Sequence, residues 1–158
     1  MNQKQKEKNI EIVKDVLRQY LHEKGYRNTP ERYAIIEEIY SLDKHFNVDD
    51  LYFLMIDKKY QVSKATIYNT IEIFLDAGLI RKHQFGEKTL TSSSYEKSYF
   101  DKQHDHLVIY KPESDKEIAE IIEFCDPRIQ GIKEAIEDAF DVEIDSHSLY
   151  FYGYKKKK

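Results

Sequence analysis

The chain has 158 residues, of which 41% are hydrophobic, and its formal net charge is −4. This length suits one ordinary domain or two small ones with hydrophobic cores of their own. No apolar run approaches the roughly 18 residues that span a bilayer, and the first ten residues hold no apolar stretch of the signal-peptide type. We therefore expect a soluble protein of the cytoplasm that does not enter a membrane.

The single cysteine, Cys125, restricts the metal chemistry that is open to the chain. One cysteine excludes an intrachain disulfide, and it excludes a structural zinc site built from several cysteines. Any metal must therefore be held by nitrogen and oxygen atoms.

Charge is divided unevenly between the two halves of the chain. Residues 1 to 91 carry 15 Lys and Arg against 14 Asp and Glu, whereas residues 92 to 158 carry 10 against 15. Because an acidic surface repels phosphate, any nucleic acid is expected to contact the N-terminal half.

Four amphipathic helices are predicted in the N-terminal half, each with a recognisable signal at one of its ends. Capping residues precede three of the helices, and glycines follow two of them. In chain order these signals are Gly25, Thr29 followed by Pro30, Asn47, Ser63 and Gly78. Two short strands at residues 79–85 and 89–95, around a turn at 86–88, follow the fourth helix.

Helices followed by a hairpin describe a winged helix-turn-helix with one additional N-terminal helix. If Ile67, Ile71 and Phe74 form the inner face of the fourth helix, its outer N-terminal end faces DNA. The exposed side chains there are Lys64, Thr66, Tyr68 and Asn69, and the hairpin adds Arg81, Lys82, His83 and Lys88. The alternative is an ordinary helical subdomain with a solvated polar face, which Glu72 and Asp76 on the same helix favour.

Strands and one helix alternate after Thr91. Strands are predicted at residues 106–111, 118–124 and 148–154, and a helix at residues 127–140. Both faces of the last strand are apolar around Phe151, which indicates that another subunit covers the sheet. The fold class is therefore α+β, with a winged helix-turn-helix domain at residues 1–88 and a small α/β dimerisation domain at residues 89–158.

The segment QHDH at residues 103–106 leads into the first of these strands. Because side chains alternate faces along a strand, His104 and His106 point one way and can ligate one cation with donors from other segments. The candidate additional donors are His45, Glu96 and Glu123. The alternative is a pair of exposed strand residues without a metal.

The opposite face of the same segment carries Gln103 and Asp105, with His147 as a candidate companion from a neighbouring strand. A neutral amide is a poorer ligand than a carboxylate or an imidazole. Plain hydrogen bonding is therefore the alternative role for this group.

Taken together, these segments resemble the ferric uptake regulator family along nearly the whole chain. The matching stretches, in order and at family-like intervals, are RNTPERYAIIEEI, HFNVDDLYFLM, VSKATIYNTIEIFLDAGLI, HDHLVIY, IIEF and HSLYFYGY. The resemblance implies a metal-responsive transcriptional regulator with a hinge near residues 86–91. It implies double-stranded promoter DNA and a second copy of the chain as partners, with no small-molecule substrate.

Carried over by position, the resemblance implies an inter-domain metal site at His45, Glu96, His104, His106 and Glu123. The two glutamates resemble those of iron-responsive members, so ferrous iron is the expected metal, with zinc or manganese able to substitute. The family's DNA-contacting segment falls on residues 65–70. The full DNA-binding set that we expect is Arg27, Lys64, Thr66, Tyr68, Asn69, Arg81 and Lys88.

Two departures from the family pattern concern metal binding. Ile109 and Pro112 stand where many members have a zinc-binding pair of cysteines, so no structural cysteine zinc site is expected. Gln103 and Gln130 stand where members have histidine and glutamate in a second metal site. Asp105 and His147 would complete that site, which we expect to be weakened.

The function expected from these features is metal-dependent repression of metal-uptake genes, without enzymatic activity. A cation held by ligands from both domains would lock the hinge and fix the spacing of two winged helices on DNA. The alternatives are a metal-dependent hydrolase that uses the two histidines with Asp105, and a winged-helix protein without metal. A peroxide-responsive or other-metal regulator of the same family is a further alternative.

Overall fold

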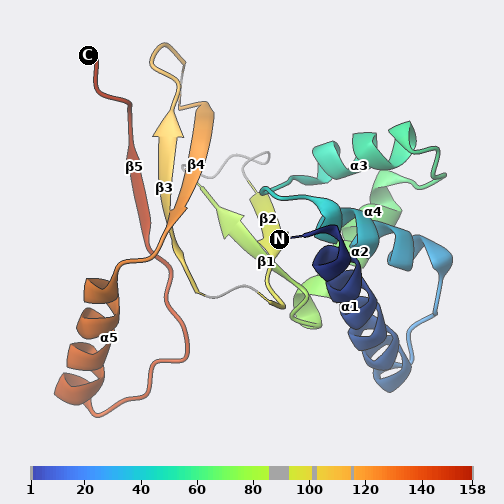
Figure 1. Ribbon diagram of the computed structural model, residues 1–158, viewed down its shortest axis with the longest axis horizontal. Helices are drawn as coiled ribbons and strands as arrows, with labels where there is room; N and C mark the ends of the chain where they lie inside the picture. The colour runs from blue at the N-terminus through green and yellow to red at the C-terminus, as the bar shows by residue number, and fades with distance from the viewer. Residues whose placement is uncertain (1, 86–92, 101–102, 115, 158) are drawn as a thin grey trace. The chain divides into compact units, whose positions relative to one another are not determined.

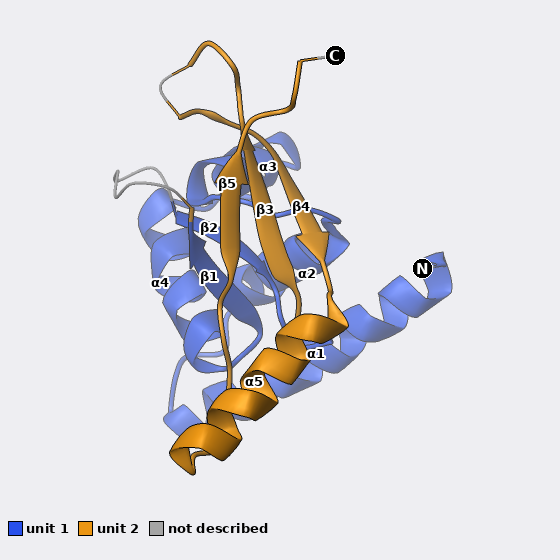
Figure 2. Cartoon of the chain, turned by 90° about the vertical axis from the view of Figure 1, so that its left-hand side faces the viewer, with its two compact units in different colours: residues 1–84, 88–101 blue, residues 85–87, 102–158 orange. Residues whose placement is uncertain are grey.

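The structure, a computed structural model, describes residues 2–85, 93–100, 103–114 and 116–157. The chain divides into two compact units, coloured separately in Figure 2: residues 1–84 with 88–101, and residues 85–87 with 102–158. We call them unit 1 and unit 2. Unit 1 includes residues 93–97, because this strand pairs with residues 80–84, and it therefore extends past the boundary at residue 88 that the sequence suggested. The expected hinge at residues 86–91 lies outside the described residues.

The described residues of unit 1 form four helices and a hairpin, which is the element order of a winged helix-turn-helix with one helix added at its N-terminus (Figure 1). Leu17, Ile39 and Ile71 are among the fully buried residues of its core. The elements are α1 (Gln3–Lys24), α2 (Pro30–Ser41), α3 (Val48–Asp57), α4 (Lys64–Asp76), β1 (Ile80–Gln84) and β2 (Ser93–Lys97).

The helix boundaries follow from the capping residues. The Asn47 side chain accepts a hydrogen bond from the Asp50 backbone N–H at 2.7 Å, and Ser63 accepts one from Thr66 at 3.1 Å. Gly25 and Gly78 have φ angles of +68° and +70°, which glycine adopts without steric cost. Thr29 occupies the N-cap position of α2, as predicted, but its side chain makes no capping hydrogen bond.

In unit 2 the residues that the structure describes form one helix and a three-stranded sheet, as the sequence predicted, so the α+β class is confirmed. The elements are β3 (Asp105–Tyr110), β4 (Ile118–Phe124), α5 (Pro127–Phe140) and β5 (Tyr150–Gly153). β3 is the central strand, antiparallel to β4 and parallel to β5. Figure 2 shows α5 at one end of this sheet.

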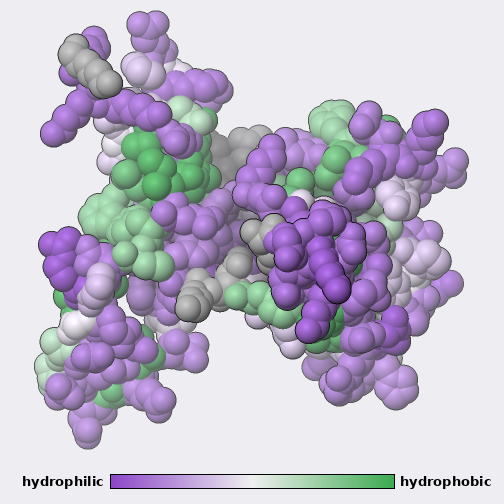
Figure 3. Space-filling model, viewed as in Figure 1, coloured by the Kyte–Doolittle hydropathy of each residue, from purple (hydrophilic) through white to green (hydrophobic). Residues whose placement is uncertain are grey.

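Unit 2 exposes much of its apolar surface. None of the residues of α5 is buried, and Ile132, Ile136 and Phe140 recur every four residues along it with 60%, 42% and 73% of their surface exposed. On β5, Phe151 is 50% exposed. Figure 3 shows hydrophobic side chains gathered over the strands of this unit. Exposed apolar patches of this kind mark interaction surfaces.

Within the described part of the chain, no helix combines the length and the apolar character that crossing a membrane requires.

The two N-cap residues are expected to contribute differently to stability. Replacing Asn47 by Ala removes the hydrogen bond that caps α3 and should lower the free energy of unfolding by about 1 kcal/mol. Replacing Thr29 by Ala removes no capping hydrogen bond and should change the free energy of unfolding by only about a few tenths of a kcal/mol. Urea unfolding in the presence of a chelator measures both values. Equal destabilisation by the two substitutions would contradict the capping assignment.

Candidate metal centre and DNA-binding surface

A short antiparallel bridge places His45 opposite Glu96. Phe46 and Tyr95 exchange backbone hydrogen bonds of 3.0 and 2.8 Å, and their rings stack with centroids 5.8 Å apart. In an antiparallel arrangement the residues that flank such a pair also face each other. The His45 Nε2 atom accordingly lies 2.9 Å from the Oε2 atom of Glu96.

The hairpin brings two further side chains to the same carboxylate. Arg81 pairs with Glu96 in register, and His83 lies two residues further along the same face of β1. His83 Nε2 lies 2.6 Å from Glu96 Oε1, and Arg81 Nη1 lies 3.5 Å from the same oxygen. Glu96 is only 5% exposed. Its burial is compensated because each carboxylate oxygen has an N–H partner.

Among the described residues, unit 1 therefore brings together three side chains that could ligate a metal. The ligand atoms of His45, His83 and Glu96 all lie within 4.8 Å of one another. Sequence reasoning nominated His45 and Glu96 but assigned His83 to the DNA-facing hairpin. Residues 81 and 83 share one face of the strand, so His83 could have been placed beside Glu96 if the hairpin register had been known.

Unit 2 gathers a second group of three donors, His104, His106 and Glu123. His106 pairs with Glu123 in register across β3 and β4, and the His104 and His106 rings lie 4.8 Å apart between centroids. His104 Nε2 is 3.9 Å from Glu123 Oε1, and the ligand atoms of all three lie within 4.8 Å of one another. His106 is 1% exposed. Its ring contacts the rings of Phe85 and Tyr150, which fix its orientation.

The opposite face of β3 carries a hydrogen-bonded chain of three residues. The Gln103 amide donates to His147 Nδ1 at 2.8 Å and to the His147 carbonyl at 3.0 Å, and His147 Nε2 lies 3.0 Å from Asp105 Oδ1. Because Nδ1 accepts, the imidazole proton is assigned to Nε2, which donates to Asp105. The fourth expected member, Gln130, lies on α5, where its amide donates to Glu134 at 3.0 Å. The structure thus joins three of the four expected residues.

The residues expected to contact DNA lie mainly on α4. Tyr68 and Asn69 are exposed, Tyr68 by 52%, while Thr66 is partly buried with its hydroxyl 2.9 Å from that of Ser63. Lys64 lies 2.8 Å from Asp49, which raises the pKa of the lysine through their hydrogen bond.

Three further residues were expected to contact DNA. Arg27 is exposed, with its carbonyl accepting a hydrogen bond from Arg32. Arg81 lies against Glu96. Lys88 lies outside the described residues. Of the residues expected to contact DNA, Arg27, Lys64, Tyr68 and Asn69 are therefore exposed.

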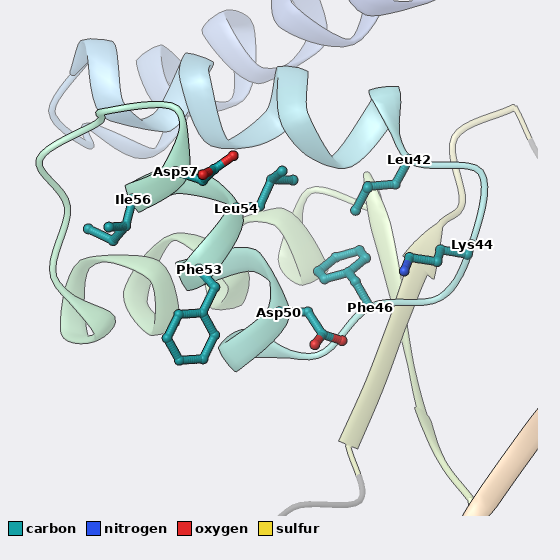
Figure 4. Close-up of a pocket in the computed structure, with 8 residues that line it drawn as sticks. All are labelled: Leu42, Lys44, Phe46, Asp50, Phe53, Leu54, Ile56 and Asp57. Carbon is teal, nitrogen blue, oxygen red and sulfur yellow. The ribbon is translucent and has the colours of Figure 1, made fainter.

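A surface cavity of about 640 Å³ opens on unit 1 beside α3 (Figure 4). Its walls are mostly apolar, with Phe53 on its rim, and none of the metal donors described above lines it. The lining residues are Leu42, Lys44, Phe46, Asp50, Phe53, Leu54, Ile56 and Asp57. A hydrolytic site needs a metal and a general base in one pocket, and none of the metal ligands predicted from the sequence lines this cavity.

Comparison with known proteins places the chain in a family. Residues 23–152 match the model of the ferric uptake regulator family. The ferric uptake regulation protein of Vibrio vulnificus is 34% identical over 137 residues, which are 85% of each chain. The ferric uptake regulator of Vibrio cholerae, at 31% identity, superposes with a TM-score of 0.66 over 87% of this chain and 98% of the other. That of Pseudomonas aeruginosa, solved with manganese, has 27% identity and a TM-score of 0.69 over 87% and 96%. The chain belongs to the ferric uptake regulator family of metal-responsive transcriptional regulators.

Proposed function

We propose that the chain is a metal-dependent repressor that binds promoter DNA as a homodimer and controls metal-uptake genes in the cytoplasm. The observation that carries this proposal is the presence of one donor group in each unit. Unit 1 supplies His45 and Glu96, and unit 2 supplies His104, His106 and Glu123, each group with its ligand atoms within 4.8 Å of one another. A single cation that takes ligands from both groups would join the two units.

The donor atoms suit a divalent transition metal. Imidazole nitrogens and carboxylate oxygens bind Fe²⁺, Mn²⁺ and Zn²⁺, whereas thiolates would favour zinc or copper. We propose ferrous iron as the physiological metal, because relatives of this chain are named ferric uptake regulation proteins. Manganese or zinc would substitute, since the same donors accept them. When bound, the metal supplies positive charge that draws the two carboxylates and three imidazoles together.

Metal binding would act on DNA affinity through the orientation of the winged helices. A dimer presents two copies of α4 to two half-sites, which must lie on a common face of the duplex. A loose connection between the units costs affinity, because the second copy must be oriented on binding. A cation that fixes this orientation would remove part of the cost, so metal binding would strengthen DNA binding.

The partner that would complete unit 2 is a second copy of the chain. Ile132, Ile136 and Phe140 on α5 and Phe151 on β5 form an exposed apolar surface too large to leave in water without cost. A homodimer would bury this surface and pair two winged helices, as a two-half-site operator requires.

The second-face residues Gln103, Asp105 and His147 are proposed to form a weakened metal site. Their hydrogen bonds join the segment before β5 to Asp105 on β3. A neutral amide at residue 103 lowers the affinity of such a site, because it donates less charge to a cation than an imidazole does.

The metal-dependent mechanism predicts that His106→Ala uncouples DNA binding from metal. Loss of one imidazole should raise the metal concentration needed for promoter binding by at least about tenfold. Anaerobic titration with Fe²⁺ or Mn²⁺, followed by promoter binding, measures this shift, and circular dichroism checks that helix content is retained. His22→Ala, on the exposed end of α1, is the matched control and should change nothing. A His106→Ala variant with the wild-type metal requirement would refute the proposal.

The DNA surface predicts a role for Asn69. If its amide reads a base edge with two hydrogen bonds, Asn69→Ala should weaken binding to the cognate promoter by about 1 to 3 kcal/mol. Asp76→Asn, at the other end of α4, is the control and should not weaken binding. An Asn69→Ala variant with full affinity would remove this residue from the interface.

The weakened site predicts a gain of metal after two substitutions. Gln103→His and Gln130→Glu together replace by better ligands the two neutral amides of the expected site, of which Gln103 contacts His147 and Gln130 lies on α5. The number of tightly held metal ions per subunit, measured by elemental analysis after dialysis, should rise by about one. An unchanged number would show that these four residues do not form a metal site.

A further inference from the structure

The side chain of His83 has a position that DNA contact does not explain. It is 4% exposed, although it lies on the hairpin that a winged helix offers to DNA. Its Nε2 atom makes the shortest described contact to Glu96, at 2.6 Å, compared with 2.9 Å for His45. The His45 and His83 rings lie 5.8 Å apart between centroids, with an interplanar angle of 67°. Two imidazoles therefore converge on one buried carboxylate within a single unit.

We propose that His45, His83 and Glu96 form a divalent-cation site that unit 1 holds by itself. The site would take a transition metal that prefers nitrogen and oxygen ligands, and it would load the DNA-binding unit before the donors of unit 2 engage. This inference rests on the proposed metal-dependent function and adds an order of assembly to it. It also adds His83 as a ligand that the family resemblance did not assign.

The geometry requires only small movements to accept a cation. Bonds of about 2.0 to 2.2 Å separate the ligand atoms around one metal by roughly 3 to 3.5 Å. The two nitrogen-to-oxygen distances here are 2.6 and 2.9 Å, and all three ligand atoms lie within 4.8 Å of one another. Room for the ion requires these two contacts to lengthen by a few tenths of an ångström and the two imidazole nitrogens to lie roughly 3 to 3.5 Å apart.

The chemistry of the group also suits a cation. Each Glu96 oxygen faces a different imidazole Nε2, so a metal that binds this carboxylate would find both nitrogens beside it. Two imidazoles and one carboxylate are a recurrent donor set for Zn²⁺ and Fe²⁺, and they leave coordination positions open. The donors of unit 2 could occupy those positions later.

A purely structural role for His83 is the competing explanation. In that case its N–H only satisfies Glu96, and a glutamine that keeps an N–H donor at the same place would replace it. The two roles separate experimentally, because glutamine is a poor metal ligand but a good hydrogen-bond donor. The informative substitution is therefore His83→Gln.

The test uses the full chain with Co²⁺ as a spectroscopic probe. The chain has six histidines. Replacing His104, His106 and His147 by Gln leaves His22, His45 and His83 as the remaining imidazoles. This background should still bind one Co²⁺ with a visible ligand-field spectrum, more weakly than wild type. Adding His83→Gln should reduce its Co²⁺ affinity by at least about tenfold, whereas adding His22→Gln should leave affinity unchanged.

Each outcome of the titration has a definite meaning. Equal Co²⁺ affinity with and without His83→Gln overturns the site in unit 1. A background that binds no Co²⁺, while wild type binds it, also overturns this site but leaves the joint site of the proposed function standing. Wild type that binds no Co²⁺ would overturn both. Thermal unfolding of each variant in chelator verifies the fold, and a folded His83→Gln variant that loses Co²⁺ supports ligation over hydrogen bonding.

Discussion

The carboxylate of Glu96 is the constraint around which the candidate metal centre is built. A buried carboxylate needs hydrogen-bond partners or neighbouring positive charge, and three side chains converge on this one. Two pairings of one strand bring them there: β2 pairs with β1 in the hairpin, and Tyr95 bridges to Phe46 beside His45. The same backbone hydrogen bonds that close the core of unit 1 thus also assemble its ligands. The contacts that bury Glu96 and the grouping of the candidate ligands therefore depend on the same strand pairings.

The alternation of side chains along β3 organises unit 2 in a comparable way. His106 faces Glu123 on one side, whereas Asp105 on the other side accepts from His147. A single strand therefore separates a group of three candidate metal donors from a group that includes the neutral amide of Gln103. The two faces differ only in the side chains that they carry, because both belong to the same strand.

Packing within unit 1 decides which side of α4 is exposed. Ile67, Ile71 and Phe74 are fully buried, so the helix can rotate little, and Tyr68 and Asn69 remain on the exposed side. The contact of Lys64 with Asp49 shows that charge near this surface is already partly compensated within the unit. Phosphate binding by this lysine would have to compete with that carboxylate.

The sequence by itself determined the helices, because caps such as Asn47 and Ser63 and the periodicity of apolar residues act over a few residues. It placed the second strand of the hairpin at residues 89–95, whereas β2 spans Ser93–Lys97. It also determined that His104 and His106 share a face, since the pleat of a strand is a local property. Only the tertiary structure decided that His83 joins Glu96 and that Gln103 donates to His147. These contacts join residues 13 and 44 positions apart in the chain. They depend on strand register and long-range packing, which a local pattern does not encode.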